Sequence, residues 1–147
     1  MAKFNPKAAQ QYVQTLQKVL VSTEEIATNV EPFFSKLATA MDAQDLTQLS
    51  QAEFSEIKAE FEDTVSAYQN NAQTLQHAQA PVRLLGTHKS LVKNYQNYAD
   101  ATQMMSDALH IADQSVDNEA FKKSEKDQED YMGKIQTNIQ KIMMASR

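Results

Sequence analysis

The sequence predicts an all-α protein, an antiparallel up-down four-helix bundle with long helices. Only two glycines and three prolines occur in 147 residues, which leaves little material for tight β-hairpins or Gly-rich phosphate loops. Alanine and glutamine, both good helix formers, make up about a quarter of the chain. Apolar residues recur at alternating steps of three and four along most of its length, as on the inward face of a bundled helix.

The first predicted helix runs from Pro6 to Met41. Asn5 can cap it, and a proline at the first helical position costs no hydrogen bond. The three-four alternation places these residues inward: Val13, Leu16, Leu20, Thr23, Ala27, Val30, Phe34, Leu37 and Met41. A second row widens this face: Tyr12, Val19, Ile26 and Phe33. The register crosses Pro32 without a shift, so we expect one helix kinked there. The alternative is a helix broken into two, with Pro32 opening the second.

The second predicted helix follows the connecting segment MDAQDLTQLS. Ser50 and Glu53 have the spacing of a capping box, in which each side chain bonds the other residue's backbone N–H group. The helix should end before Pro81, because the residue ahead of a proline is displaced from helical geometry. Its apolar face contains Phe54, Ile57, Phe61, Val65, Tyr68, Ala72 and Leu75.

The third predicted helix has the longest unbroken register. Its inward positions are Pro81, Leu84, His88, Leu91, Tyr95, Tyr98, Thr102, Met105, Leu109, Ala112 and Val116. Asp117 or Asn118 can cap a fourth helix. The inward face of that helix carries Phe121, Gln128, Met132, Ile135, Ile139 and Ile142. No linker or low-complexity tract divides the chain, so we expect a single helical-bundle domain over residues 1–147.

The composition argues against several classes of function. With no cysteine, disulfides, thiolate metal sites and cysteine nucleophiles are excluded. A net charge of −5 with scattered lysines and arginines argues against a nucleic-acid partner. No apolar run approaches the ~20 residues of a membrane span, and the start MAKFNPKAAQ lacks the apolar region of a signal peptide. We therefore expect no integral membrane segment and a cytoplasmic location as given, or an extracytoplasmic one if a leader was removed.

Neither a metal centre nor a catalytic site is predicted. A di-iron bundle needs inward glutamates and Glu-x-x-His pairs, yet the inward positions hold no Asp or Glu. Asp107 has the matching spacing to His110, but both lie off the inward face. Acids that follow the Ser50 cap are expected on exposed faces: Glu53, Glu56, Glu60 and Glu62. Because no nucleophile, base and orienting group can be placed together, we expect no enzyme, no cofactor and no metal ligand.

Polar and aromatic side chains interrupt the inward face of the third helix. They are His88, Tyr95, Tyr98 and Thr102, with Tyr68, Gln128 and Tyr131 on other helices. We interpret His88 as a buried neutral imidazole bonded to a backbone carbonyl or a nearby tyrosine. The whole set is then a hydrogen-bonded core that fixes helix register. The functional alternative is a cleft that admits a small apolar ligand, with His88, Tyr95, Tyr98 and Thr102 as its lining.

Residues 80–109 also carry a recognisable pattern. Ala80 and Pro81 precede His88, Leu91, Tyr95 and Tyr98, and the segment continues to Met105 and Leu109. This P…H..L…Y..Y arrangement resembles a segment of small helical-bundle proteins of Gram-positive bacteria, many of them lipoprotein-like or cell-envelope proteins of unassigned function. The resemblance implies a helical bundle and brings no activity or catalytic residues. The lipoprotein members carry a leader and a lipid-bearing cysteine, neither of which we expect in this chain.

Three functions follow as expectations. The leading one is a non-catalytic interaction or scaffold protein, acting through an outer helix face on an unknown protein partner or by self-association. The first alternative is a small apolar-ligand binder with an inter-helix cleft near His88, Tyr95 and Tyr98. The second alternative is a peripheral membrane-surface or cell-envelope protein, which the scarcity of Lys and Arg beside the apolar faces disfavours.

Overall fold

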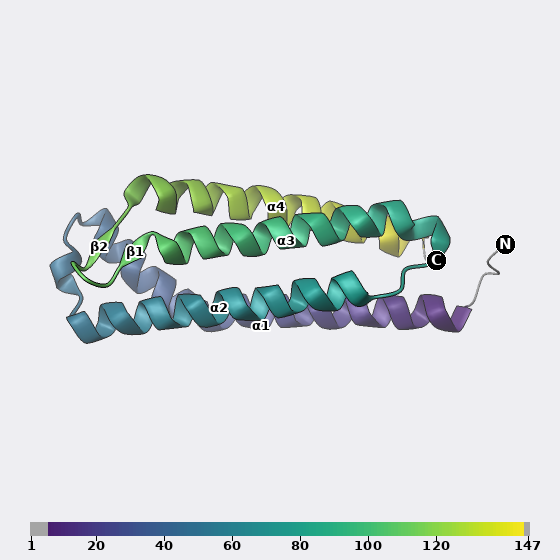
Figure 1. The fold of residues 1–147 in the computed structure, drawn as a ribbon, viewed down its shortest axis with the longest axis horizontal. Helices are drawn as coiled ribbons and strands as arrows, with labels where there is room; N and C mark the ends of the chain where they lie inside the picture. The colour runs from purple at the N-terminus through teal and green to yellow at the C-terminus, as the bar shows by residue number, and fades with distance from the viewer. Residues whose placement is uncertain (1–5, 146–147) are drawn as a thin grey trace.

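The computed structural model describes residues 6–145, in which four long helices pack side by side in an elongated rod (Figure 1). The helices are α1 (Pro6–Asp42), α2 (Gln51–His77), α3 (Leu85–Asp107) and α4 (Asn118–Ala145). The connections contain two 3-10 turns, η1 (Leu46–Gln48) and η2 (Val82–Leu84), and two short paired strands, β1 (Leu109–His110) and β2 (Ser115–Val116). The predicted all-α class is confirmed. Consecutive helices run in opposite directions along the rod (Figure 1).

Helix α1 is continuous through Pro32, so the alternative of two separate helices is wrong. Proline cannot donate the hydrogen bond that the carbonyl of Thr28 would otherwise accept. Both residues are exposed, so water can reach that carbonyl and the helix persists. The predicted cap of α1, Asn5, lies outside the described residues.

The capping box at the start of α2 is confirmed. The Ser50 side chain accepts from the Glu53 backbone N–H at 3.1 Å, and the Ser50 N–H donates to Glu53 Oε1 at 3.0 Å. Lys36 of α1 adds an ion pair to Glu53 at 2.5 Å. The hydrogen bond from Lys36, followed by those from Ser50, lowers the pKa of Glu53 to about 2. These contacts therefore connect α1 to the start of α2. Helix α2 ends at His77, before Pro81 as predicted.

Helix α3 is shorter than predicted at both ends. It starts at Leu85 after the η2 turn and ends at Asp107, whereas the three-four spacing extended it to Val116. The residues beyond Asp107 form the β1–β2 hairpin, in which Leu109 is buried and Val116 packs against the core. Both side chains point inward from the hairpin, and their spacing in the sequence matches that of a helix. The three-four pattern therefore predicted a helix that is too long.

The β1–β2 hairpin is held by a turn that the spacing did not reveal. Gln114 has a positive φ of 51°, and its side-chain amide donates to the carbonyls of Leu46 at 3.2 Å and Leu49 at 2.8 Å. The hairpin is thereby fastened to the connection between α1 and α2. Asp117 then caps α4, as predicted, by accepting from the Ala120 N–H at 3.1 Å.

The core is divided into two apolar clusters along the rod. The first cluster lies around the start of α1 and the end of α4 and includes Tyr12, Leu16, Val19, Leu75, Leu91, Ile135 and Ile142. The second cluster lies nearer the hairpin and includes Leu37, Phe54, Ile57, Phe61, Met105 and Phe121. Within residues 6–145, the buried polar side chains are Thr23, Thr64, His88, Thr102, Ser106, Ser124 and Asn138. None of these carries a carboxylate, an ammonium or a guanidinium group.

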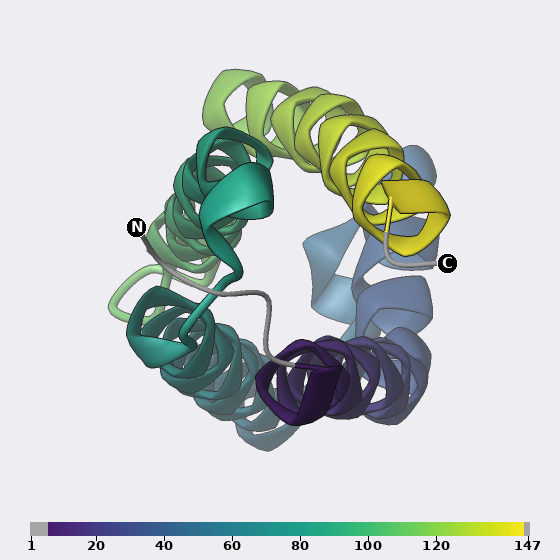
Figure 2. The same cartoon turned by 90° about the vertical axis from the view of Figure 1, so that its right-hand side faces the viewer.

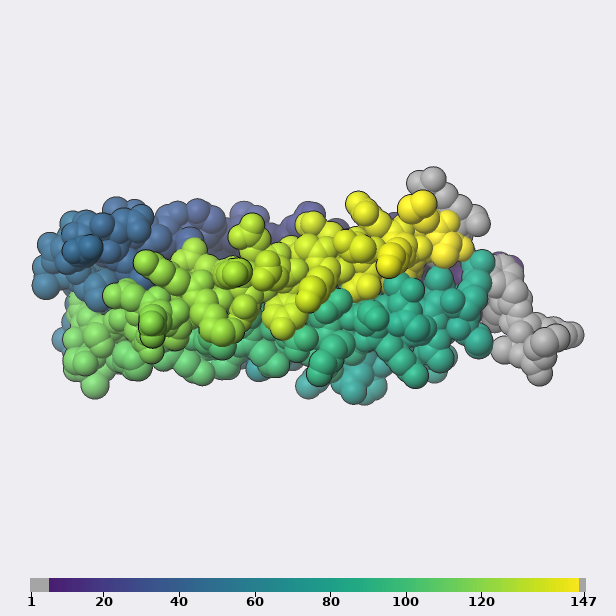
Figure 3. Space-filling model, turned by 90° about the horizontal axis from the view of Figure 1, so that it is seen from above, coloured from purple at the N-terminus to yellow at the C-terminus, as the bar shows by residue number. Residues whose placement is uncertain are grey.

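The bundle is least tightly closed between α1 and α4. Consecutive helices pack closely, whereas the backbones of α1 and α4 approach each other far less. Viewed down the rod, the four helices follow one another around the axis and α1 and α4 complete the ring (Figure 2). Figure 3 shows α4 running lengthwise between α3 on one side and α1 on the other. Phe34 of α1 and Phe121 of α4 bridge the two helices by stacking, with ring centroids 6.0 Å apart.

Looser closure on this side changes which residues of α1 are buried. Val30 and Phe34 are only half-buried, and Ala27 is exposed, although all three occupy predicted inward positions. Tyr12 and Val19, from the second row, are instead fully buried. The inward face of α1 is thus turned toward α2 and α3, away from α4.

Candidate functional site

A cavity of about 280 Å³ lies where the two apolar clusters meet. All four helices line it, through Ala27, Val30, Glu31 and Phe34 of α1, Phe61, Thr64 and Tyr68 of α2, Tyr98, Thr102 and Met105 of α3, and Glu125 and Gln128 of α4. Ala27, Glu31 and Glu125 are exposed, whereas the residues from α2 and α3 are buried. The cavity therefore opens to solvent between α1 and α4.

Two buried tyrosines form the inner wall of the cavity. The rings of Tyr68 and Tyr98 lie nearly perpendicular, with centroids 4.9 Å apart, and the Tyr98 hydroxyl donates to the Tyr68 hydroxyl at 3.5 Å. Burial raises the pKa of both phenols. Both hydroxyls are therefore protonated and neutral at physiological pH, so the inner wall is aromatic and uncharged.

The four predicted site residues do not all meet at this cavity. Tyr98 and Thr102 line it, whereas His88 and Tyr95 lie outside its wall. His88 instead pairs with Tyr12 of α1, with 2.7 Å between Nδ1 and the phenol oxygen. Burial lowers the pKa of His88 and raises that of Tyr12 to about 12, so a protonated phenol can donate to a neutral imidazole. The interpretation of His88 as a buried imidazole bonded to a tyrosine is confirmed.

Tyr95 takes part in a hydrogen-bond chain that joins three helices. Asn71 of α2 donates to the Tyr95 hydroxyl at 3.0 Å, and Tyr95 is 2.7 Å from Thr23 Oγ1 on α1. Thr23 donates to the carbonyl of Val19 at 2.7 Å, so the Tyr95 hydroxyl is the donor to Thr23. A satisfied buried chain of this kind fixes the relative register of the helices. Tyr95 therefore acts in the core, apart from the cavity.

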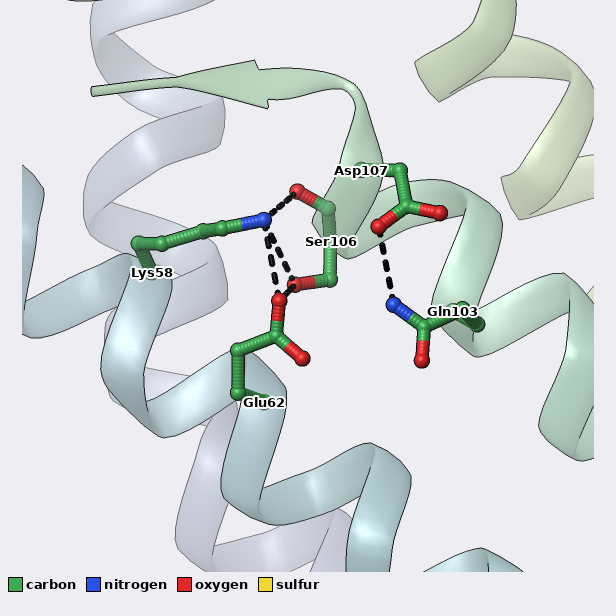
Figure 4. A network of polar contacts seen from close by, with 5 residues as sticks. All are labelled: Lys58, Glu62, Gln103, Ser106 and Asp107. Atoms are coloured by element: carbon green, nitrogen blue, oxygen red, sulfur yellow. Dashed lines mark hydrogen bonds and ion pairs between the residues drawn. The ribbon is translucent and has the colours of Figure 1, made fainter. Parts of the chain in front are cut away.

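A second polar cluster joins α2 to the end of α3 (Figure 4). Lys58 donates to the Ser106 carbonyl at 2.5 Å and to Ser106 Oγ at 3.1 Å, and it pairs with Glu62 at 3.0 Å. Ser106 Oγ donates to Glu62 at 2.8 Å. The hydrogen bond from Ser106, and next that from Lys58, lowers the pKa of Glu62.

A serine, a lysine and a glutamate could act as a nucleophile and its base. The geometry of this cluster indicates instead that it stabilises the packing of α2 against α3. Ser106 is fully buried, with 0% of its surface exposed, and its hydroxyl proton is directed at a carboxylate. Lys58 instead satisfies a carbonyl in the last turn of α3, where a cation also opposes the helix dipole. Of the four acids expected on exposed faces, Glu56 is exposed, whereas Glu53, Glu60 and Glu62 are half-buried. The i,i+4 spacing of Lys58 and Glu62 signals their pairing, but nothing in the sequence points to Ser106.

The described part of the chain shows neither a metal centre nor a membrane span. Between residues 6 and 145, no three His, Asp or Glu side chains gather as metal ligands would. None of the helices in that range combines the length and apolar content needed to cross a bilayer.

The fold and the cavity together define the class: a helical-bundle protein with an internal hollow that opens on one side. No family model, curated protein or solved structure matches the chain. The resemblance to helical proteins of Gram-positive bacteria therefore stays a prediction.

Proposed function

We propose that the protein binds a small, largely apolar organic molecule in the cavity between α1 and α4. The observation that supports this proposal is the hollow of about 280 Å³ itself. The hollow is open to solvent on one side, so a ligand can enter it between α1 and α4. An engineered apolar cavity of about 150 Å³ accepts benzene, so this cavity has room for about a dozen non-hydrogen atoms.

The lining supports binding better than catalysis. Its buried part is mainly aromatic or aliphatic, through Phe61, Tyr68, Tyr98 and Met105, with Thr64 and Thr102 as its polar members. The neutral phenols can orient a ligand by hydrogen bonding but are held in their protonated form by burial. This combination of an apolar wall with a few polar groups is typical of small-molecule sites.

The other functions expected from the sequence stay predictions. The exposed large apolar side chains of the described residues lie on separate elements: Val21 on α1, Val82 on η2, Leu85 at the start of α3, Ile111 in the hairpin and Met144 on α4. Such scattered residues are normal on a protein surface and do not support a scaffold role over ligand binding. A membrane-surface role and a cytoplasmic location likewise stay predictions.

The proposal is tested by titrating the protein with neutral aromatic probes such as phenol and indole, followed by two-dimensional NMR. At ~0.3 kcal/mol per non-hydrogen atom, a ligand of a dozen such atoms would bind with a Kd of about 2 mM, and the smaller probes indole and phenol with a Kd of about 10–30 mM, so the titration extends to tens of millimolar. We expect shifts concentrated at Val30, Thr64, Thr102 and their neighbours. Absence of localised shifts with every probe, in protein shown to be folded, would overturn the proposal.

A variant that blocks the entrance supplies the control. Ala27 is exposed and lines the cavity, so Ala27→Phe should fill its mouth without disturbing the core. Thr28, the next residue, is also exposed but does not line the cavity, so Thr28→Phe adds the same side chain elsewhere. We expect Ala27→Phe to weaken probe binding at least about tenfold, since the ring occupies the ligand's volume. Thr28→Phe should bind like the original chain.

A further inference from the structure

The chemistry of the cavity wall indicates the class of ligand, an inference that rests on the binding function proposed above. We infer that the ligand is an organic cation, with an apolar body that enters the cavity and an ammonium group that stays at its mouth. The inference depends on three features of the lining: its hydrogen-bond donors, its charges and its aromatic faces.

The two threonines of the wall direct their hydroxyl protons away from a ligand. Thr64 Oγ1 donates to the carbonyl of Glu60 at 2.8 Å. Thr102 Oγ1 donates to the carbonyl of Tyr98 at 3.0 Å. Both residues back-bond to their own helix, so each offers the cavity an oxygen that can accept and no proton to donate.

Two further donors of the wall are also used within the protein. The Tyr98 hydroxyl donates to Tyr68, and the Gln128 amide donates to the Met105 sulfur at 3.7 Å. The Tyr68 hydroxyl proton and the second amide proton of Gln128 remain available to donate to a ligand. The wall therefore accepts hydrogen bonds more readily than it donates them, which favours a ligand that carries several N–H donors.

The charges of the lining have one sign. Within residues 6–145, the charged side chains that line the cavity are Glu31 of α1 and Glu125 of α4, on the two helices that flank its opening. Ser35 donates to Glu31 Oε1 at 2.6 Å and leaves the other carboxylate oxygen to accept. Lys122 lines a neighbouring hollow toward the hairpin, together with Asp42 and Glu125, and does not line this cavity. Carboxylates at both sides of the mouth attract a cationic ligand and repel an anionic one.

The interior of the cavity matches the rest of such a molecule. Phe34, Phe61, Tyr68 and Tyr98 supply aromatic surface, which packs against an apolar body and attracts a nearby cation through its ring faces. A bare inorganic cation would lose its hydration here without enough oxygen ligands to replace it. The lining therefore favours an ammonium group attached to about ten carbon atoms, given the room for about a dozen non-hydrogen atoms.

The test compares three probes of nearly the same size: 3-phenylpropylamine, 3-phenylpropan-1-ol and 3-phenylpropanoate. Binding of each is measured by NMR titration near pH 7 at low salt. We expect the amine to bind about five- to tenfold more tightly than the alcohol, and the carboxylate to bind most weakly, because two exposed carboxylates each contribute a modest attraction. The preference for the amine should shrink in ~1 M NaCl, where the Debye length is about 3 Å.

Two double variants with equal net charge make the assignment specific. The first double variant removes the carboxylates at the mouth of the cavity, by Glu31→Gln and Glu125→Gln. The second, which is the control, removes two exposed carboxylates of α1 and α4 that do not line the cavity, by Glu24→Gln and Glu129→Gln. We expect the first pair to abolish the preference for the amine and to leave binding of the alcohol within about twofold, because the apolar body makes the same contacts. The second pair should retain the preference.

The outcomes separate this inference from the function on which it rests. If the alcohol binds in the cavity as tightly as the amine, the binding function stands and the inference of a cationic ligand is wrong. Persistence of the amine preference in the Glu31→Gln, Glu125→Gln protein would also overturn the inference. If none of the three probes binds, the proposed function itself fails and the inference fails with it.

Discussion

At the scale of single residues, the polar side chains of the core divide into two groups with different roles. His88 and Tyr95 make hydrogen bonds that cross between helices, to Tyr12 and to Thr23 and Asn71. Tyr98 and Thr102, one and two turns further along α3, border the cavity instead. The sequence identifies all four as interruptions of an apolar face. It does not show which of them face a partner across the core, because that depends on side chains that α1 and α2 place opposite.

The His88–Tyr12 pair predicts a pH dependence of stability. Burial lowers the pKa of His88 in the folded protein below the value of about 6.5 expected when unfolded. Between these two pKa values the unfolded chain binds more protons, so stability is fully present above about pH 6.5 and falls as the pH drops toward the folded pKa. We expect the free energy of unfolding to fall by at most about 1.4 kcal/mol from pH 7.5 to 5.5, which is the limit for a single group that titrates near pH 6.5 in the unfolded chain, and chemical denaturation measures it.

Two variants assign this pH dependence to His88. His88→Gln cannot titrate and should lose most of the difference between the two pH values. His110→Gln, at an exposed position, should keep it. The lowered carboxyl pKa values, including that of Glu53 at about 2, lie below this pH window and do not contribute. An unchanged pH dependence in His88→Gln would show that the imidazole is not held neutral by the fold.

At the scale of elements, local sequence signals predict a helix boundary best where a capping side chain marks it. Ser50 with Glu53, and Asp117, are caps whose side chains make the expected bonds. The end of α3 was misplaced because Leu109 and Val116 keep helical spacing while pointing inward from a hairpin. The hairpin depends on Gln114, whose side chain bonds the α1–α2 connection, a contact across 65 or more positions that no local pattern contains.

The presence of Pro32 within α1 predicts that this helix is less stable than the same helix without a proline. The proline is exposed and interrupts the hydrogen bonding of an otherwise continuous helix, so its substitution should restore one bond without affecting the core. We expect Pro32→Ala to raise the free energy of unfolding by about 1–3 kcal/mol, measured by urea denaturation. Asn29→Ala, also exposed on α1, changes helix propensity alone and should gain at most about 0.7 kcal/mol. A destabilised Pro32→Ala protein would mean that the proline shapes α1 for its packing.

At the scale of the whole molecule, the central feature is a rod with two packed ends and a hollow between them. The sequence predicts the helices and their apolar faces, including Tyr98 and Thr102 as part of a candidate cleft. It does not predict that the hollow lies between α1 and α4, because Ala27, Val30 and Phe34 have the spacing of inward residues. Their partial exposure follows from how far α1 and α4 separate, which is a property of the assembled bundle.

The most direct test of this account is a crystal structure of the protein under xenon pressure. Xenon enters preformed apolar cavities without needing any particular hydrogen bond, so it reports the hollow independently of the ligand. We expect a xenon atom in contact with Phe61, Tyr98 and Met105, with solvent or a second atom nearer Glu31 and Glu125. A structure in which α1 and α4 close together, Val30 and Phe34 fill the space and no xenon is bound there would contradict the account.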